Sequence, residues 1–206
     1  RGNIIAKELP FIRKAVDVMD ELHKTSGSPW YNRVTMPNQK KNPQTTISSA
    51  TFVDSLEPLM KKTFAGGKKQ KPKPALSDVD EQNCVRHINS VWNGIKKVNP
   101  AMFEKKNACN FVIQHTIGTM AIHLVLTLMH TNGDSEKLRK ATSEEWKKLF
   151  NISSLKNSKD WDKGPKGKYG GKFTNYGTNK KSFNFIADTL YQEVKKTKIW
   201  KNNYAD

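Results

Sequence analysis

The chain has 206 residues, with 36 lysines and arginines against 19 aspartates and glutamates, which gives a formal net charge of +17. The apolar residues are bunched into periodic segments, which excludes a disordered polymer, and the length allows one core with at most a small appendage. The charge predicts a polyanionic partner, and nucleic acid is the first candidate.

Cysteine usage and the start of the chain carry further expectations. Cys84 and Cys109 are too few for a disulfide framework, and both stand in helical apolar patterns. We therefore expect two buried free thiols in a reducing compartment, the cytoplasm. Residues 1–14 mix charges throughout and lack the apolar stretch of a secretory signal. Because the chain begins at Arg1, we expect it to be a fragment of a larger protein.

The first predicted helix covers residues 9–24, where apolar side chains recur at spacings of three and four. It should end near Gly27, because glycine readily adopts the left-handed conformation that closes a helix. Residues 28–44 contain three prolines and no sustained period, so a loop or short extended structure is expected there.

A second helix is predicted from about residue 49 to residue 64, with Ser48 or Ser49 as its N-cap. Pro58 should kink or divide it, because proline lacks the backbone N–H that a helix interior uses. Further on, Ser77 and Asp80 resemble a capping box that opens a long helix.

The long helix carries an apolar stripe from Cys84 to Val98, and Asn99-Pro100 predicts a short helix directly after it. Residues 107–131 then contain no acidic or basic residue other than histidine, and they are apolar around nearly the whole circumference of a helix. The length suits a membrane span, but the polar Gln114, two histidines and several threonines favour a buried central helix. Gly118 should let a neighbouring helix approach closely.

The C-terminal part predicts a helix opened by Thr142 and a last helix capped by Ser182. With no convincing alternating strand, the chain is expected to be mainly α, a single helical domain built round a buried central helix. Its subregions would be residues 9–64 and 77–195, joined by a basic linker at residues 65–76.

Two glycine-bearing segments hold much of the excess charge. The first lysine-rich segment, residues 61–74, has six lysines and no acid, and the second lysine-rich segment, residues 156–181, has eight lysines against two aspartates. Lysines contact phosphates, and the aromatic residues interleaved in the second segment could stack on unpaired bases. The alternative is a solvated surface with the aromatic rings tucked onto the helical body. The candidate nucleic-acid contacts are Arg33, Lys40, Lys41, Lys68, Lys69, Lys71, Lys73, Trp161, Lys163, Lys166, Lys168, Tyr169 and Lys172.

No other chemistry is predicted from the residues. The glycines at 164–171 never reach the spacing of a nucleotide-phosphate loop, and no apolar strand precedes them. His115 and His123 lie eight residues apart and could face a common space, but neither has an acidic or cysteine neighbour at metal-ligand spacing. Histidines hydrogen-bonded in the core are expected instead. We predict no metal site, no cofactor and no catalytic residue.

Several segments, in order along most of residues 9–195, carry a family pattern. They are residues 28–34, 47–59, 88–95, 99–103 and 116–118, and the stretch around Trp161, Gly164 and Gly167. Together they resemble the C-terminal half of the DGQHR-domain family, which includes the DndB-type proteins of bacterial DNA phosphorothioation systems.

The resemblance implies a prokaryotic or mobile-element protein concerned with DNA modification or defence, so DNA is expected rather than RNA. The Asp-Gly-Gln-His-Arg signature itself is absent from the chain, so no activity attached to it is assigned to a residue here. We expect a helical module that binds DNA electrostatically and contacts the N-terminal half of the same protein or a partner chain, with no membrane. The alternatives are part of an enzyme whose catalytic residues lie upstream, or a structural protein-interaction module.

Overall fold

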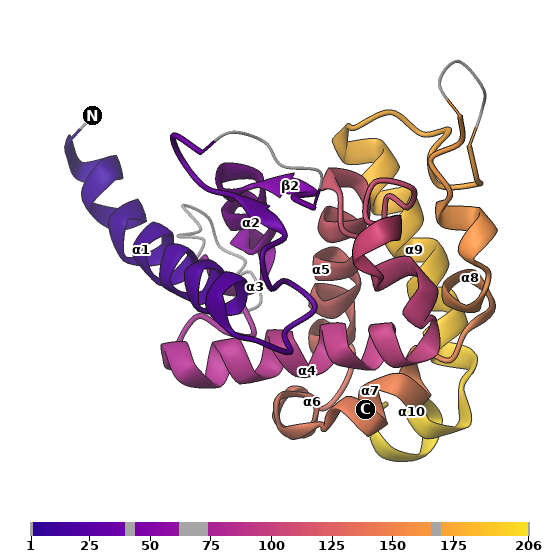
Figure 1. Ribbon diagram of the computed structural model, residues 1–206. Coiled ribbons are helices and arrows are strands. Elements are labelled where there is room, and N and C mark those ends of the chain that lie inside the picture. The colour runs from indigo at the N-terminus through magenta and orange to yellow at the C-terminus, as the bar shows by residue number, and fades with distance from the viewer. Residues whose placement is uncertain (1, 40–43, 62–73, 166–169, 206) are drawn as a thin grey trace.

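Helices make up most of the backbone, as the sequence predicts. The computed structural model describes residues 2–39, 44–61, 74–165 and 170–205 (Figure 1). The strands found in these ranges are β1 (Val34–Thr35) and β2 (Ile47–Ser48), which pair in parallel. The prediction of a mainly α fold is therefore confirmed.

The first two helices follow the predicted signals. α1 (Gly2–Lys24) starts earlier than expected but ends just before Gly27, whose φ of 90° is the left-handed value that glycine tolerates best. α2 (Ser49–Ser55) begins after Ser48, whose side chain accepts a hydrogen bond from the backbone N–H of Thr51. Ser48 is thus the N-cap, one of the two residues predicted for this position.

The predicted division at Pro58 is also confirmed. α3 (Glu57–Met60) follows α2 after a break at Leu56, and Pro58 lies in the first turn of α3. Proline fits there because its missing N–H would have no partner inside the helix. The predicted continuation to Phe64 lies outside the described residues.

α4 (Glu81–Val98) packs against both α1 and α7 (Ser143–Leu149). Its N-cap is Asp80, whose carboxylate accepts the backbone N–H of Asn83. The expectation that Ser77 opens this helix is wrong, because the chain is still turning at that point.

α5 (Thr116–Thr131) is the apolar helix, but it is shorter than the predicted 107–131. The residues before it form irregular turns, and the backbone N–H of Val112 donates to a carbonyl of the second lysine-rich segment at 2.9 Å. This hydrogen bond gives the Val112 N–H a partner that a helix would otherwise have to supply. The expected helix contact at Gly118 is wrong as well, because the backbone of Ile113 packs there and a Cβ would overlap it.

The C-terminal part holds more helices than the sequence indicates. The predicted start of α7 at Thr142 is confirmed, and Thr142 and Glu145 form a capping box there, bonded reciprocally. α9 (Lys180–Lys196) is capped by Asn179 instead of Ser182, because the Asn179 side chain accepts the backbone N–H of Ser182. The remaining helices and 3-10 turns are η1 (Pro100–Phe103), η2 (Lys105–Asn107), α6 (Ser135–Lys140), α8 (Ser153–Lys156), η3 (Ser158–Trp161) and α10 (Lys198–Asn203).

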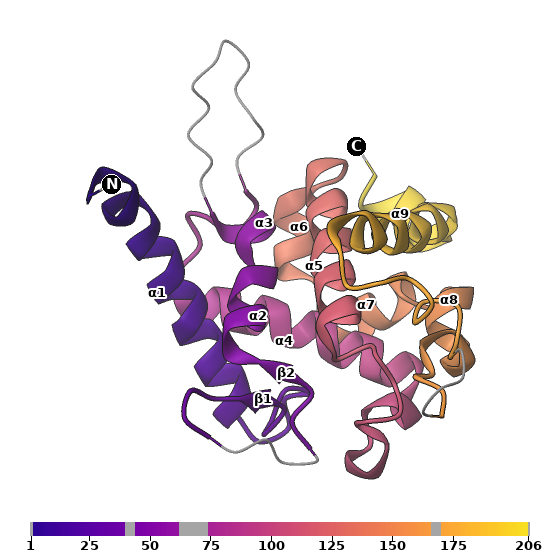
Figure 2. The ribbon, with the colours of Figure 1, turned by 90° about the horizontal axis from the view of Figure 1, so that it is seen from above.

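One hydrophobic core joins the larger helices. α5 contacts α2 and α3 on one side and α9 on the other, and α4 runs across the bundle (Figure 2). Trp92 of α4 lies edge-on to Trp30, with 4.8 Å between ring centroids, and both are fully buried. Because buried side chains from Ala15 to Tyr204 belong to the same cluster, the predicted subregions share this core.

The two cysteines, both expected to be buried, differ in exposure. Cys84 is buried as expected, but Cys109 is exposed, because it lies in the turns before α5 and not in a helix. Across the described residues, no helix has both the length and the apolar character needed to cross a membrane.

The closest approach of α4 and α7 yields a stability prediction. A Cβ at Gly94 would overlap the Cβ of Trp146, so Gly94→Ala should force the two helices apart and lower the free energy of unfolding by about 1–3 kcal/mol in urea denaturation. Gly177→Ala is the matched control, because its new Cβ would meet only a flexible side chain, at 3.3 Å. Equal stability of the two variants would contradict the packing described here.

Candidate nucleic-acid interface

The second lysine-rich segment is anchored by two aromatic rings that point into the protein. Trp161 and Phe173 are both fully buried, with 4.6 Å between their ring centroids. The indole N–H of Trp161 donates to the carbonyl of Ser154 at 2.8 Å. The prediction that Trp161 stacks on bases is therefore wrong, because its ring faces and its N–H are already used inside the core.

The glycines of this segment let the chain fold back on itself. A Cβ at Gly171 would overlap the carbonyl oxygen of Lys159, and a Cβ at Gly170 would overlap that of Asp162. The backbone N–H of Gly171 donates to the same Asp162 carbonyl at 2.7 Å. The glycines thus serve close backbone packing, and the anchored rings fix where the lysines between them emerge.

The lysines of this segment lie on the surface. All six described members are exposed, and they are Lys156, Lys159, Lys163, Lys172, Lys180 and Lys181. None of the ion pairs between described residues involves them. The two aspartates of the segment accept local hydrogen bonds instead, Asp160 from the Asn157 amide and Asp162 from the backbone of Gly164. The segment therefore presents concentrated positive charge to solvent.

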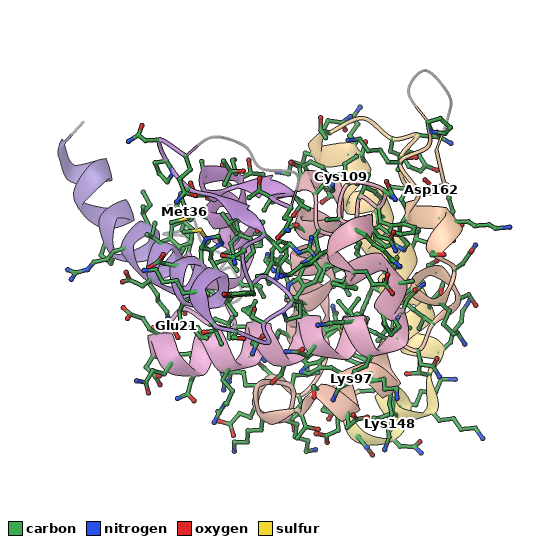
Figure 3. The ribbon with its side chains drawn as sticks, viewed as in Figure 1. Glu21, Met36, Lys97, Cys109, Lys148 and Asp162 are labelled. Carbon is green, nitrogen blue, oxygen red and sulfur yellow. The ribbon has the colours of Figure 1, made fainter. Side chains whose placement is uncertain are left out.

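A second basic stretch is tied to this segment. Phe111 and Asp162 form an antiparallel bridge, and the backbone N–H of Lys163 donates to the Asn110 carbonyl at 2.7 Å. Figure 3 shows Cys109 and Asp162 at the same edge of the molecule. The exposed Lys105 and Lys106 of η2 stand a few residues before this bridge in the chain, and Lys106 pairs with Glu104 at 3.3 Å.

An aromatic pair, one ring exposed and the other half-buried against the core, completes the site. Tyr176 and Phe185 lie with ring centroids 4.8 Å apart, and Phe185 is 45% exposed on the outer face of α9. Lys181 stands one turn before Phe185 on the same face. The sequence prediction missed Phe185, although its position off the buried stripe of the last helix was a usable signal. We call Lys163, Lys172, Tyr176, Lys180, Lys181 and Phe185 the lysine–aromatic surface.

The other predicted nucleic-acid contacts are Arg33, which is buried, and residues that lie outside the described ranges. Arg33 is 4% exposed, and its guanidinium donates to the carbonyls of Phe103 at 2.7 Å and Gln44 at 3.3 Å. Its predicted role on the cationic surface is therefore wrong, because its charge is used inside to hold two loops. The predicted contacts outside the described residues are Lys40, Lys41, Lys68, Lys69, Lys71, Lys73, Lys166, Lys168 and Tyr169.

His123 occupies the junction of three helices. The indole N–H of Trp92 donates to its Nε2 at 3.2 Å, and its Nδ1 lies 2.8 Å from the Oγ of Ser55. Since an indole can only donate, Nε2 must be unprotonated, which assigns the proton of the neutral imidazole to Nδ1. The Ser55 hydroxyl in turn donates a hydrogen bond to the Phe52 carbonyl at 2.5 Å, so the ring nitrogens of His123 and the Ser55 hydroxyl all have partners. Burial lowers the pKa of His123 to about 3.

The remaining core histidines form a second polar chain. His130 Nε2 lies 3.1 Å from His87 Nε2, and His130 Nδ1 lies 2.9 Å from the Oγ of Ser135. Burial lowers the pKa of His130 to about 4 and holds that of His87 well below its usual value. The prediction of hydrogen-bonded core histidines is confirmed, but a space shared by His115 and His123 is wrong, because His115 pairs with the Ala108 carbonyl.

In the part of the chain that the structure describes, no three histidine, cysteine or acidic side chains are placed to hold a metal ion together. No family model, curated protein or solved structure matches the chain.

The buried histidines predict a pH-dependent stability. Their folded pKa values, about 3 for His123 and about 4 for His130, lie below the usual 6.5, so the unfolded chain binds more protons as the pH falls. Their contribution is fully present above pH 6.5 and is lost on acidification. Between pH 7 and pH 5 we expect the free energy of unfolding to fall by about 2 kcal/mol per buried histidine.

Urea denaturation at the two pH values measures this loss, and nitrogen NMR of the imidazoles reports the tautomer directly. His123 should show a protonated Nδ1 and no titration near its usual pKa. Equal stability at both pH values, or a His123 signal that titrates with a pKa near 6.5, would contradict the assignment.

Proposed function

We propose that this protein binds nucleic acid through the lysine–aromatic surface, with a preference for unpaired strands. The observation that carries the proposal is the exposed ring of Phe185, backed by the half-buried Tyr176, beside Lys180 and Lys181 at the start of α9, which are exposed and form no ion pair with another described residue. Lysines on flexible stems neutralise phosphates, and aromatic rings stack on bases of any identity. The combination is typical of binding without sequence preference.

The preference for unpaired strands follows from the aromatic pair. In a duplex the base faces are already stacked on one another, so Phe185 would gain little from it, whereas a single strand can lay a base on the exposed ring. The lysines serve both forms, because phosphates are present in each. DNA in preference to RNA is proposed on the DGQHR resemblance alone, and so is a role in DNA modification or defence.

The lysines predict a salt-dependent affinity. Replacing Lys180 and Lys181 together with glutamine should weaken single-strand binding and reduce the slope of log affinity against log salt by about 1.4, since each phosphate contact contributes roughly 0.7. The measurement is fluorescence anisotropy of a labelled strand between about 50 and 200 mM salt.

The matched control replaces Lys147 and Lys148, which are also adjacent, exposed and helical but lie on α7. Binding by the wild-type protein that does not weaken with salt would contradict the electrostatic proposal. An equal loss in both double variants would place the contact elsewhere on the charged surface.

The proposed preference for single strands over duplex depends on the ring of Phe185. Phe185→Ala should cost single-strand binding about 1–3 kcal/mol, a loss of roughly 5- to 150-fold, and leave duplex binding nearly unchanged. Tyr31→Ala is the control, because Tyr31 is an aromatic residue of similar exposure, 37%, outside the lysine–aromatic surface. If the two variants bind a single strand equally well, stacking on Phe185 is disproved.

A further inference from the structure

A cavity of about 740 Å³ lies over α5, between α3 and α9. Figure 2 shows these three helices side by side, with α5 in the middle. The apolar part of its lining includes Pro58 of α3, Met120 and Leu124 of α5, and Phe183 of α9. This volume falls within the range of about 300–1,000 Å³ in which proteins hold small molecules.

His130 and Ser135, which are hydrogen-bonded to each other, both line the cavity. Behind them His87 Nδ1 is buried, and no described group bonds to it. A buried N–H without a partner is rarer than an unpaired acceptor, which favours placing the His87 proton on Nε2. His87 then donates to His130 Nε2, and His130 Nδ1–H donates to Ser135. Ser135 accepts in this arrangement, so its own hydroxyl hydrogen can donate to a group in the cavity that it lines.

The rim connects the cavity to the lysine-rich segments. Lys61, the first residue of the first lysine-rich segment, lines the cavity and pairs with Glu57 at 2.9 Å. Pro74, the last residue of that segment, lines it too. Lys180 lines it as well and also belongs to the lysine–aromatic surface. α9 has no acidic residue in its first turn, so the positive end of its backbone dipole adds to Lys180 at this opening.

We propose that this cavity receives one unpaired nucleotide of a strand held on the lysine–aromatic surface, an inference that rests on the proposed function. The faces of a base are apolar and suit the side chains of Leu124, Met120 and Phe183. The acceptors on its edge suit the Ser135 hydroxyl, and its phosphate suits Lys180 at the rim. The lining thus offers apolar side chains, a hydroxyl and the Lys180 ammonium, one for each part of a nucleotide, beside the carboxylates of Asp54 and Glu57.

A strand carrying 2-aminopurine tests the proposal, because this base fluoresces more strongly when it leaves the stack. Wild-type protein should raise the fluorescence on binding. Leu124→Trp, which fills the cavity, should abolish at least nine-tenths of that rise while salt-dependent binding to the lysine–aromatic surface persists. Leu128→Trp is the control, because Leu128 is half-buried one turn further along α5 and lies outside the cavity lining.

The possible failures are distinguishable. Salt-dependent binding without a rise, or with a rise that survives in Leu124→Trp, would overturn the cavity proposal and leave the proposed function standing. No salt-dependent binding by the wild-type protein would overturn both. Titration of free dAMP separates the two sources of the ligand: competition by dAMP supports a free nucleotide, and dependence on the strand supports an extruded base.

A second measurement needs no variant and covers the case in which Leu124→Trp does not fold. A strand with 5-iodouracil should crosslink to the wild-type protein on irradiation, and mass spectrometry should find the adduct on Met120 or Phe183. Adducts found solely on Tyr176 or Phe185 would show the strand on the surface with no base inside, and would overturn the proposal.

Discussion

The imidazole of His123 is bonded to two other helices at once, and the arrangement of the bundle depends on that neutral side chain. Trp92 of α4 donates to one ring nitrogen, and Ser55 of α2 accepts from the other. Phe52 and Trp92 both lie edge-on to the ring, and His123 is fully buried. Since a charged imidazole could not accept from an indole, the three helices keep their positions while His123 stays neutral.

The proposed functions rely on this junction because they are built on α5. α9 packs along α5, so the position of α5 sets where Lys180 and Phe185 emerge. The floor of the cavity comes from the same helix, through Met120 and Leu124. A rigid core thus supports a charged surface whose own lysines repel one another. The buried rings of Trp161 and Phe173 offset that repulsion by holding the second lysine-rich segment against the protein.

Sequence patterns predicted the elements that depend on local signals. Caps and apolar periodicity located the starts of α2, α4, α7 and α9 and the end of α1 within a few residues, because each signal lies within one helical turn of the boundary it marks. The irregular turns before α5 were mistaken for helix, because a stretch without charge looks the same in either form. The backbone there pairs Phe111 with Asp162 and is not helical, and this contact joins residues far apart in the chain. The pairing of His87 with His130 was missed for the same reason.

The candidate site was predicted in part. Counting lysines located the second segment, and Lys163 and Lys172 are exposed as a phosphate contact requires. Counting could not separate Trp161, which is buried, from Tyr176, which reaches Phe185, because aromatic residues in a loop have no period that tells inside from outside.

If nucleic acid binds the lysine–aromatic surface, as we propose, the bound strand shields the backbone there from solvent. Hydrogen–deuterium exchange of the wild-type protein, with and without a saturating single strand, tests it most directly. We expect slower exchange in peptides covering residues 170–185 and unchanged exchange in those covering residues 135–150, which are also lysine-rich. Slowing confined to residues 135–150, or no slowing anywhere at saturation, would contradict it.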